Sequence, residues 1–224
     1  MCGRYQLTIR YEEAEAVFDA SAVEPFGPRF NIAPTQRAPV VRHGIGGRTL
    51  APLRWGLIPH WAPDASRAAR MINARGETIT QKPSFREGIQ RRRCIVPATG
   101  FYEWARVGQT KQPYLINLRH STVFGMAGLW DRWDGPDGPV ESFTVLTVDP
   151  RGALDIHDRM PVILSPDAYG DWLAPKSSAA TVLDLVRPRA AHELVLTAVS
   201  HRVNSVANDD PRCATPVTVQ ESLL

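Results

Sequence analysis

The sequence predicts an α+β domain built around a curled, mostly antiparallel sheet with few helices. Three observations lead to this fold class. The chain has 224 residues, of which 43% are hydrophobic and 22% are charged, so it can bury one sizeable core. No internal repeat or linker divides it, and we expect a single domain over residues 1–224. Short β-branched or aromatic segments bounded by turn residues are frequent, whereas helical patterns are few.

The predicted strands follow one another along most of the chain. They cover residues 38–43, 50–58, 93–98, 100–107, 113–118, 122–130, 142–148, 160–165 and 193–200. The first two flank the stretch "GIGG" at residues 44–47. Because "GIGG" lacks the G-x-G-x-x-G spacing of a phosphate-binding loop and opens no evident helix, we interpret it as a turn.

Three short helices are predicted between the strands. The helix at residues 11–20 would place three apolar side chains on one side, those of Ala14, Val17 and Phe18. Ser84 with Glu87 three residues later has the spacing of a capping box and predicts the start of a second helix. The run Ser-Pro-Asp at residues 165–167 predicts the start of a third, because Ser is a good N-cap and Pro is tolerated at the first helical position.

The cysteines and the chain start bear on cellular location. The three cysteines, Cys2, Cys94 and Cys213, are odd in number and widely scattered, which argues against a disulfide framework and against a CxxC-type zinc site. We expect Cys94 and Cys213 to be buried thiols. The N-terminus has no signal-peptide pattern and the apolar runs are too short to span a bilayer. We therefore expect a cytoplasmic protein with no membrane partner, no metal and no other cofactor.

The positive charge is almost entirely arginine. The formal net charge is +3, and only 3 of the 26 basic residues are lysines. The planar guanidinium fork suits bidentate phosphate contacts better than a lysine does, which weakly favours a nucleic-acid partner. Genome base composition by itself also replaces lysine with arginine, so this explanation stays open.

A cysteine directly follows the initiator methionine. Removal of Met1 would make Cys2 the first residue and give it two nucleophiles on adjacent carbons. Its thiol and its α-amine would titrate near 8.5 and near 7.7 to 8.0, so both would be partly deprotonated at neutral pH. Two simpler explanations are a small residue that happens to follow the start codon and a lipid-anchored cysteine.

Residues able to do chemistry gather in four short stretches, which carry Cys2 and Arg4, Asn73 and Arg75, Glu103, and His157 and Arg159. Asn73 and Arg75, two apart, would share one face of a strand. Glu103 lies among aromatic residues, and apolar surroundings raise a carboxyl pKa toward the range that suits acid or base catalysis. His157 supplies an imidazole able to titrate near pH 7.

Each candidate also has a purely structural alternative. Asn73 would cap a turn, Glu103 would pair with a surface arginine, and His157 would be a partly buried imidazole with its hydrogen bonds satisfied. Together, however, the four stretches supply a nucleophile, an acid or base, an imidazole and phosphate-seeking arginines.

Seven motifs in one order resemble a known family. They are "MCGRY", "RFNIAPTQ", "WGLIPHW", "INARGET", "RRCIVPATGFYEW", "AGLWD" and "DIHDRMPVIL", and the match continues to "PRCATPV" near the C-terminus. This pattern resembles the SRAP family, the SOS-response-associated peptidase-like proteins. The resemblance implies a single α+β domain with a barrel-like, mostly antiparallel β core, a few flanking helices and a basic groove. It also implies a covalent link between the N-terminal Cys and abasic sites in single-stranded DNA, which shields the lesion during replication.

Carried over motif by motif, the resemblance assigns roles to individual residues. The nucleophile would be Cys2, with Asn73, Glu103 and His157 as its active-site partners. The DNA-binding residues would be Arg4, Arg75 and Arg159 on the flanking phosphates, with Pro34 and Trp61 forming an apolar shelf for bases. Two arginines outside the motifs, Arg48 and Arg187, are expected to take no part in DNA binding.

The chemistry of an N-terminal cysteine fits this role on its own terms. An abasic deoxyribose is in equilibrium with an open-chain aldehyde. The α-amine of Cys2 would form a Schiff base with it, and the thiol would then close a five-membered thiazolidine ring. Left alone, the imine could eliminate the 3′ phosphate in a lyase-like reaction. Glu103 and His157 would move protons, and Asn73 would hold the amine or the opened sugar.

Two other functional classes stay open. One is an N-terminal-nucleophile peptidase or amidase, which fits the family's peptidase label and a self-catalysed removal of Met1. The other is a non-covalent reader of single-stranded or modified DNA, with Cys2 only structural. Nothing in the sequence suggests more than a monomer.

Overall fold

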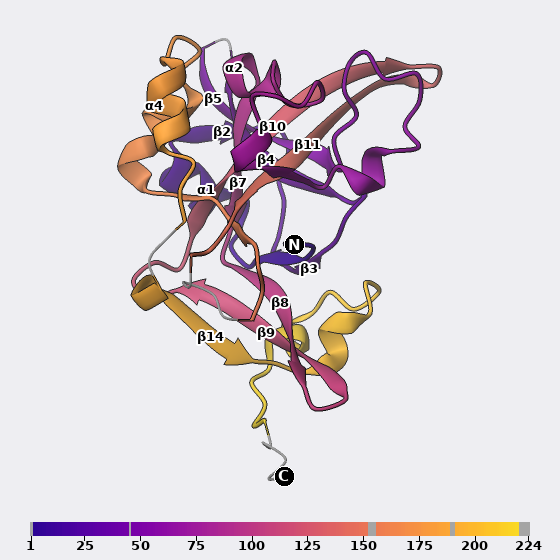
Figure 1. Ribbon diagram of the computed structural model, residues 1–224, viewed down its shortest axis with the longest axis vertical. Helices are drawn as coiled ribbons and strands as arrows, with labels where there is room; N and C mark the ends of the chain where they lie inside the picture. Colours follow the sequence, from indigo (N-terminus) through magenta and orange to yellow (C-terminus); the bar gives the residue numbers. More distant parts are fainter. Residues whose placement is uncertain (1, 45, 152–155, 189–190, 220–224) are drawn as a thin grey trace.

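The computed structural model describes residues 2–44, 46–151, 156–188 and 191–219. Within these residues five strands close a barrel (Figure 1): β4 (Arg37–Gly44), β5 (Gly47–Trp55), β7 (Arg93–Ala98), β10 (Phe124–Gly135) and β11 (Gly138–Val148). Antiparallel pairings follow the order β11, β10, β7, β4, β5, and a parallel pairing of β5 with β11 completes the ring. The expected single domain with a barrel-like, mostly antiparallel core is confirmed.

Shorter strands extend the barrel wall. They are β2 (Ala20–Ala22) beside β5, β6 (Asn73–Arg75) and β12 (Met160–Pro161) beside β11, and β13 (Ile163–Leu164) beside β10. The β4–β5 hairpin contains the predicted turn, with Gly44 paired to Gly47; its Ile45 lies outside the described residues. Strand β6 runs parallel to β11, so it brings residues 73–75 against the C-terminal end of β11, beside residues 145–147.

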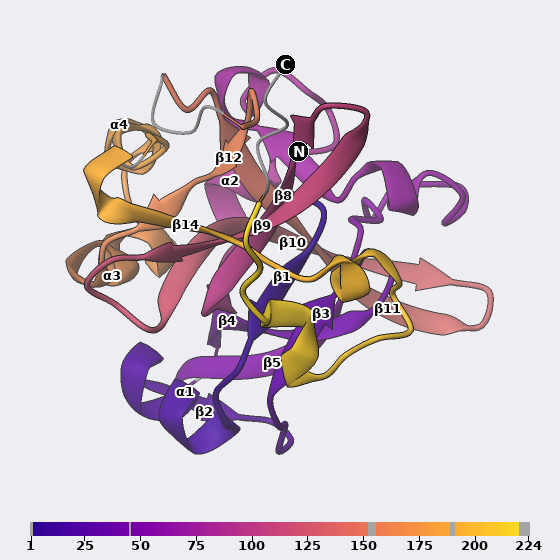
Figure 2. The ribbon, with the colours of Figure 1, turned by 90° about the horizontal axis from the view of Figure 1, so that it is seen from below.

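A second sheet packs at one end of the barrel (Figure 2). Among the described residues it has five strands, in the order β14 (Leu194–Ala198), β9 (Thr110–Leu118), β8 (Gly100–Val107), β1 (Tyr5–Leu7) and β3 (Arg29–Ile32). The chain passes from the barrel to this sheet between β7 and β8. The first residue of β8, Gly100, has to be a glycine, because a Cβ there would lie 2.7 Å from both the Leu115 side chain and the Asn117 amide nitrogen.

Aromatic side chains join the two sheets in one core. The Tyr5 ring of β1 meets the Trp55 ring of β5 edge-on at 5.2 Å, and Trp55 stacks at 6.2 Å on Phe143 of β11. All three side chains are fully buried. The Trp55 indole also donates to Ile72 O at 2.9 Å, which fixes the segment that leads directly into β6.

The helices of the described residues lie outside the barrel. They are α1 (Tyr11–Phe18), α2 (Gly88–Arg91), α3 (Tyr169–Leu173) and α4 (Ala179–Asp184), with 3-10 turns η1 (Ala68–Arg70), η2 (Gly76–Thr78), η3 (Pro166–Ala168), η4 (Ala191–Glu193), η5 (His201–Asn204) and η6 (Pro211–Ala214). None of the described helices is long and apolar enough to cross a membrane. The expected third helix begins where Ser165 and Pro166 placed it, as η3 running into α3.

Two helix predictions need correction. In α1, Ala14 and Phe18 are buried as expected, but Val17 is 46% exposed, and the helix ends at Phe18 because Asp19 adopts a left-handed conformation. The capping box at Ser84 is wrong: residues 82–87 form consecutive turns and α2 begins only at Gly88. The carboxylate of Glu87 accepts from Arg92 at 2.9 Å and does not cap a helix.

Candidate active site at the start of the chain

Cys2 is completely buried and lies next to Glu103 and Asn73. Strand β1 is antiparallel to β8 with Tyr5 opposite Phe101, so the residues that precede β1 run along β8 toward Glu103. The Asn73 amide nitrogen donates to Cys2 O at 2.8 Å. Burial raises the pKa of the Cys2 thiol far above its ordinary value, and the nearby Glu103 carboxylate raises it further. The sulfur is therefore held protonated. Met1 lies outside the described residues.

Glu103 is a buried carboxyl in an apolar setting. Its side chain is 3% exposed, and burial raises its pKa from 4.5 to about 7. Desolvation disfavours the charged form, so both forms of this carboxyl are populated near neutral pH. The position thus has the property that the aromatic surroundings predicted, and it can donate or accept a proton at physiological pH.

His157 faces Glu103 from the segment that precedes β12. Its Nε2 lies 3.9 Å from Glu103 Oε2, and its Nδ1 accepts from the backbone N–H of Arg159 at 3.0 Å. In the neutral imidazole this arrangement leaves the proton on Nε2, the nitrogen that faces Glu103. Burial lowers the pKa of His157, while the exposed Asp158 carboxylate, 2.9 Å from Nδ1, acts in the opposite direction.

The Asn73 side chain uses its amide nitrogen in a hydrogen bond to Cys2, whereas its amide oxygen has no partner among the described residues. Strand β6 places its side chain beside Cys2, with Ala74 buried behind it and Arg75 exposed beyond it. The carboxamide oxygen Oδ1 is buried and has no hydrogen-bond partner among the described residues. Because a buried acceptor without a partner costs free energy, Oδ1 is a ready acceptor for a donor that arrives at Cys2.

The three arginines of the motifs have different surroundings. Arg4 is half-buried, donates to Asn31 Oδ1 and to Val203 O at 2.7 Å each, and lies 5.8 Å over the Trp104 ring. Arg159 makes a bidentate contact with Glu77, both bonds at 2.8 Å, and its side chain is only 11% exposed. Arg75 is exposed and makes no ion pair with a carboxylate of the described residues. Of the three, Arg75 has the freest guanidinium.

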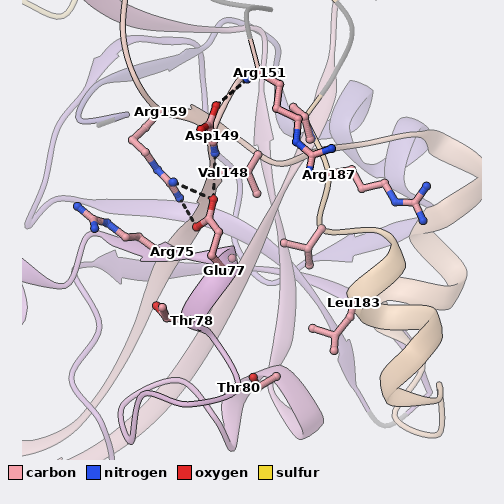
Figure 3. Close-up of a pocket in the computed structure, with 13 residues that line it drawn as sticks. Arg75, Glu77, Thr78, Thr80, Val148, Asp149, Arg151, Arg159, Leu183 and Arg187 are labelled. Carbon is pink, nitrogen blue, oxygen red and sulfur yellow. Dashed lines mark hydrogen bonds and ion pairs between the residues drawn. The ribbon is translucent and has the colours of Figure 1, made fainter.

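Arg75 and Arg159 both line a cavity of about 700 Å³ beside the site (Figure 3). Two further arginines, Arg151 and Arg187, line the same cavity, which we call the arginine pocket. Arg187, which was expected to take no part in DNA binding, lines this cavity together with two motif arginines, because the segment after α4 folds back against η2. The Val186 side chain there would be 2.5 Å from a Cβ at Gly76.

Comparison with known proteins identifies the family. The family model described as SOS response associated peptidase (SRAP) matches residues 1–206. This chain belongs to the SRAP family.

SRAP relatives match along nearly the whole chain. The Bacillus subtilis "Abasic site processing protein YoqW" is 40% identical over 218 residues, covering 94% of this chain and 97% of that protein. The chicken (Gallus gallus) "Abasic site processing protein HMCES" is 34% identical over 227 residues, covering 86% and 67%. A crystal structure of a Bacteroides thetaiotaomicron protein superposes with a TM-score of 0.88 at 28% identity, covering 97% of this chain and all of that one.

The structure brings some of the SRAP motif residues together and leaves others apart. Cys2, Asn73, Glu103 and His157 form one cluster, in line with their shared placement by the motifs. Trp61 is 55% exposed and lines a different cavity of about 320 Å³ with Pro59 and Arg67. Pro34 is half-buried in the turn that follows β3.

Sequence reasoning missed residues that support the SRAP cluster. Asn31 is fully buried and fixes Arg4, and Glu77 fixes Arg159. Glu77 stands inside the quoted motif "INARGET", so its alternation with Arg75 was an available signal. No local pattern marks Arg151 or Arg187. All three cysteines are buried free thiols, as expected for Cys94 and Cys213. Among the described residues no group of three or more His, Cys, Asp or Glu could hold a metal ion.

Proposed function

We propose that this protein senses abasic sites in single-stranded DNA and captures them as a covalent thiazolidine crosslink through Cys2 after removal of Met1. The crosslink shields the lesion during replication. The observation that carries the proposal is the burial of Cys2 between Asn73 and the Glu103–His157 pair. The names of the SRAP relatives, abasic site processing proteins, support the same substrate.

The amine attacks first in this mechanism. Burial keeps the thiol protonated, so the nitrogen of Cys2 adds to C1′ of the open-chain aldehyde and forms the C–N bond. Asn73 Oδ1, which has no partner among the described residues, accepts a hydrogen bond from this nitrogen. Glu103, with a pKa of about 7, protonates the hydroxyl of the carbinolamine, and water leaves to give the imine.

The thiol then completes the adduct. Sulfur adds to the imine carbon and forms the C–S bond, while the thiol proton moves through Glu103 to the ring nitrogen. One water is lost over the whole sequence and no oxidant is needed. When the closed sugar opens, the imidazolium form of His157 gives its Nε2 proton to the sugar ring oxygen, and the ionised Glu103 carboxyl, 3.9 Å from Nε2, takes the proton of the C1′ hydroxyl and returns it to His157. Capture by sulfur removes the imine before it can eliminate the 3′ phosphate.

A denaturing gel tests the proposal. The protein is mixed with a single-stranded oligonucleotide that carries one abasic site, and with the same oligonucleotide without it. The proposal expects a shifted, heat-stable band only with the abasic strand. Free DNA together with cleavage of a peptide substrate would instead support an N-terminal-nucleophile peptidase, and free DNA after native-gel binding would support a non-covalent reader.

A further inference from the structure

The arginine pocket has an excess of positive charge that the protein does not neutralise internally. Its lining includes four arginines against two carboxylates, Glu77 and Asp149. Glu77 is already paired with Arg159, whose hydrogen bonds lower the pKa of Glu77 to about 2. Arg151 contacts Asp149 through its backbone N–H, which donates a hydrogen bond to the Asp149 carboxylate. The guanidinium groups of Arg75 and Arg151 make no ion pair with any described carboxylate.

The positive groups lie on two sides of the pocket. In Figure 3, Arg75 and Arg159 stand on one side, and Arg151 and Arg187 stand on the other. Arg187 pairs with Asp184, three residues earlier, and both side chains are largely exposed to water. Such exposed pairs contribute little. Because the guanidinium groups of Arg75 and Arg187 point away from each other in Figure 3, the two sides would hold two successive phosphates of a strand.

An apolar wall lies between these arginines. Leu183, Val186 and Val148 line the pocket together with the hydroxyl-bearing Thr78 and Thr80. Leu183 of α4 faces the pocket and is 39% exposed, so its apolar surface is open to a ligand there. The wall is firmly placed, because Val186 and Val148 both pack on Gly76 so closely that a Cβ there would not fit. An apolar surface flanked by cations matches a nucleobase attached to its phosphate.

Two arginines of the pocket are close in sequence to residues of the Cys2 cluster. Arg75 follows Asn73 by two residues on β6, and Arg159 follows His157 by two residues. A strand whose abasic sugar lies at Cys2 would therefore reach the pocket with a neighbouring nucleotide. A volume of about 700 Å³ is within the range of sites that take small organic ligands.

We propose that the arginine pocket binds one nucleotide of the same DNA strand beside the lesion, with the phosphate on its lesion side on Arg75, the phosphate on its far side on Arg151 and Arg187, and its base on Leu183 and Val186. This inference rests on the proposed function and extends it, because Arg151 and Arg187 lie outside every motif of the sequence analysis.

Truncated strands test the proposal. Oligonucleotides with a central tetrahydrofuran, which lacks the aldehyde, are shortened one nucleotide at a time from the 5′ side or from the 3′ side, and affinity is measured by fluorescence anisotropy. On one of the two sides, removing the pocket nucleotide should weaken binding by about fivefold or more. Arg151→Ala and Arg187→Ala should weaken binding to the long strand similarly and show no further loss on that truncation.

The control is Arg10→Ala. Arg10 is as exposed as Arg187, 69% against 64%, and also pairs with a carboxylate close in sequence, but it does not line the pocket. It should respond to truncation as the unchanged protein does. Equal truncation losses in all proteins, or no loss from either side, would overturn the pocket assignment. A crosslink of the unchanged protein to an aldehyde-bearing strand is measured separately, so failure of the proposed function is distinguishable.

Discussion

Burial sets the protonation of both groups that would meet the DNA sugar. It holds the Cys2 thiol protonated and brings the pKa of the Glu103 carboxyl to about 7. The carboxyl can therefore hold the proton that the thiol must lose in the second step. In the proposed mechanism, Asn73 Oδ1 accepts a hydrogen bond from the Cys2 nitrogen, and His157 Nε2 gives a proton to the sugar ring oxygen.

Replacing Cys2 with Ser should convert a permanent adduct into a transient one. The amine can still form an imine, but a stable five-membered ring with sulfur cannot close. We expect adducts that survive only after borohydride reduction, together with some strand cleavage, on a denaturing gel. A residue added ahead of Cys2 should abolish the reaction as well. Heat-stable crosslink at the original level in Cys2→Ser would rule out the thiazolidine.

Glu103→Gln should remove a pH dependence of stability. The folded protein holds the carboxyl proton more tightly than the unfolded chain does, since the pKa is about 7 against 4.5. The contribution of Glu103 to the free energy of unfolding is therefore highest below pH 4.5 and falls by up to about 3 kcal/mol as the pH rises through 7. Urea unfolding from pH 4 to 8 should show this fall in the unchanged protein and a flatter profile in Glu103→Gln.

The matched control for that series is Glu13→Gln, an exposed carboxyl of α1. It should leave the fall between pH 4.5 and 7 in place. An equal fall in Glu103→Gln and in the unchanged protein would show that another group is responsible.

His157→Ala should slow both directions of the crosslinking reaction. If Nε2 protonates the sugar ring oxygen during opening, the same group must act when the sugar closes again during reversal. Acid and base groups typically contribute factors of about 10² to 10⁴. Single-turnover rates of formation and release measure this, with the exposed His43→Ala as the control. Unchanged rates in both directions would return His157 to a structural role.

At the scale of elements, strand β6 and the turn η2 carry the link between chemistry and DNA binding. Within six residues they supply Asn73 to Cys2, Arg75 to the arginine pocket and Glu77 to Arg159. The parallel pairing with β11 fixes Asn73 beside Val145 and Arg75 beside Thr147, and Glu77 follows directly in η2.

Arg75→Ala should weaken DNA binding without stopping the chemistry. If Arg75 holds one phosphate, its loss should reduce the slope of log affinity against log salt by about 0.7 on single-stranded DNA. The loss should be the same for intact and abasic strands, and a crosslink should still form at high protein concentration. Anisotropy across a salt series measures the slope. Arg10→Ala, far from the pocket lining, should leave it unchanged, and equal slopes for both variants would end the phosphate assignment.

Local sequence pattern predicted some elements to the residue. β7 and β8 begin and end where "RCIVPA" and "GFYEWARV" do, because β-branched and aromatic runs there are bounded by turn residues. The predicted strand holding Asn73 and Arg75 is present as β6. The short strands β1, β2 and β3 were not predicted, since three or four residues carry too little periodicity.

For the whole molecule, the missing information was long-range pairing. The barrel closes where Arg54 and Trp55 pair with Ser142 and Phe143. The local sequence of either segment does not predict which other segment it pairs with. The motifs supplied Cys2, Asn73, Glu103 and His157 as candidates, but only the β1–β8 and β6–β11 registers bring them together. The same limitation concealed Arg187, which reaches the arginine pocket through the packing of Val186 on Gly76.

The intact mass of the crosslinked product, before and after borohydride treatment, tests capture by Cys2 directly. We expect a mass equal to the protein without Met1 plus the abasic strand minus one water. Borohydride should leave that mass unchanged, because a thiazolidine has no C=N bond to reduce. A product that keeps Met1, or one that gains two hydrogens on reduction, would contradict capture by the amine and thiol of Cys2.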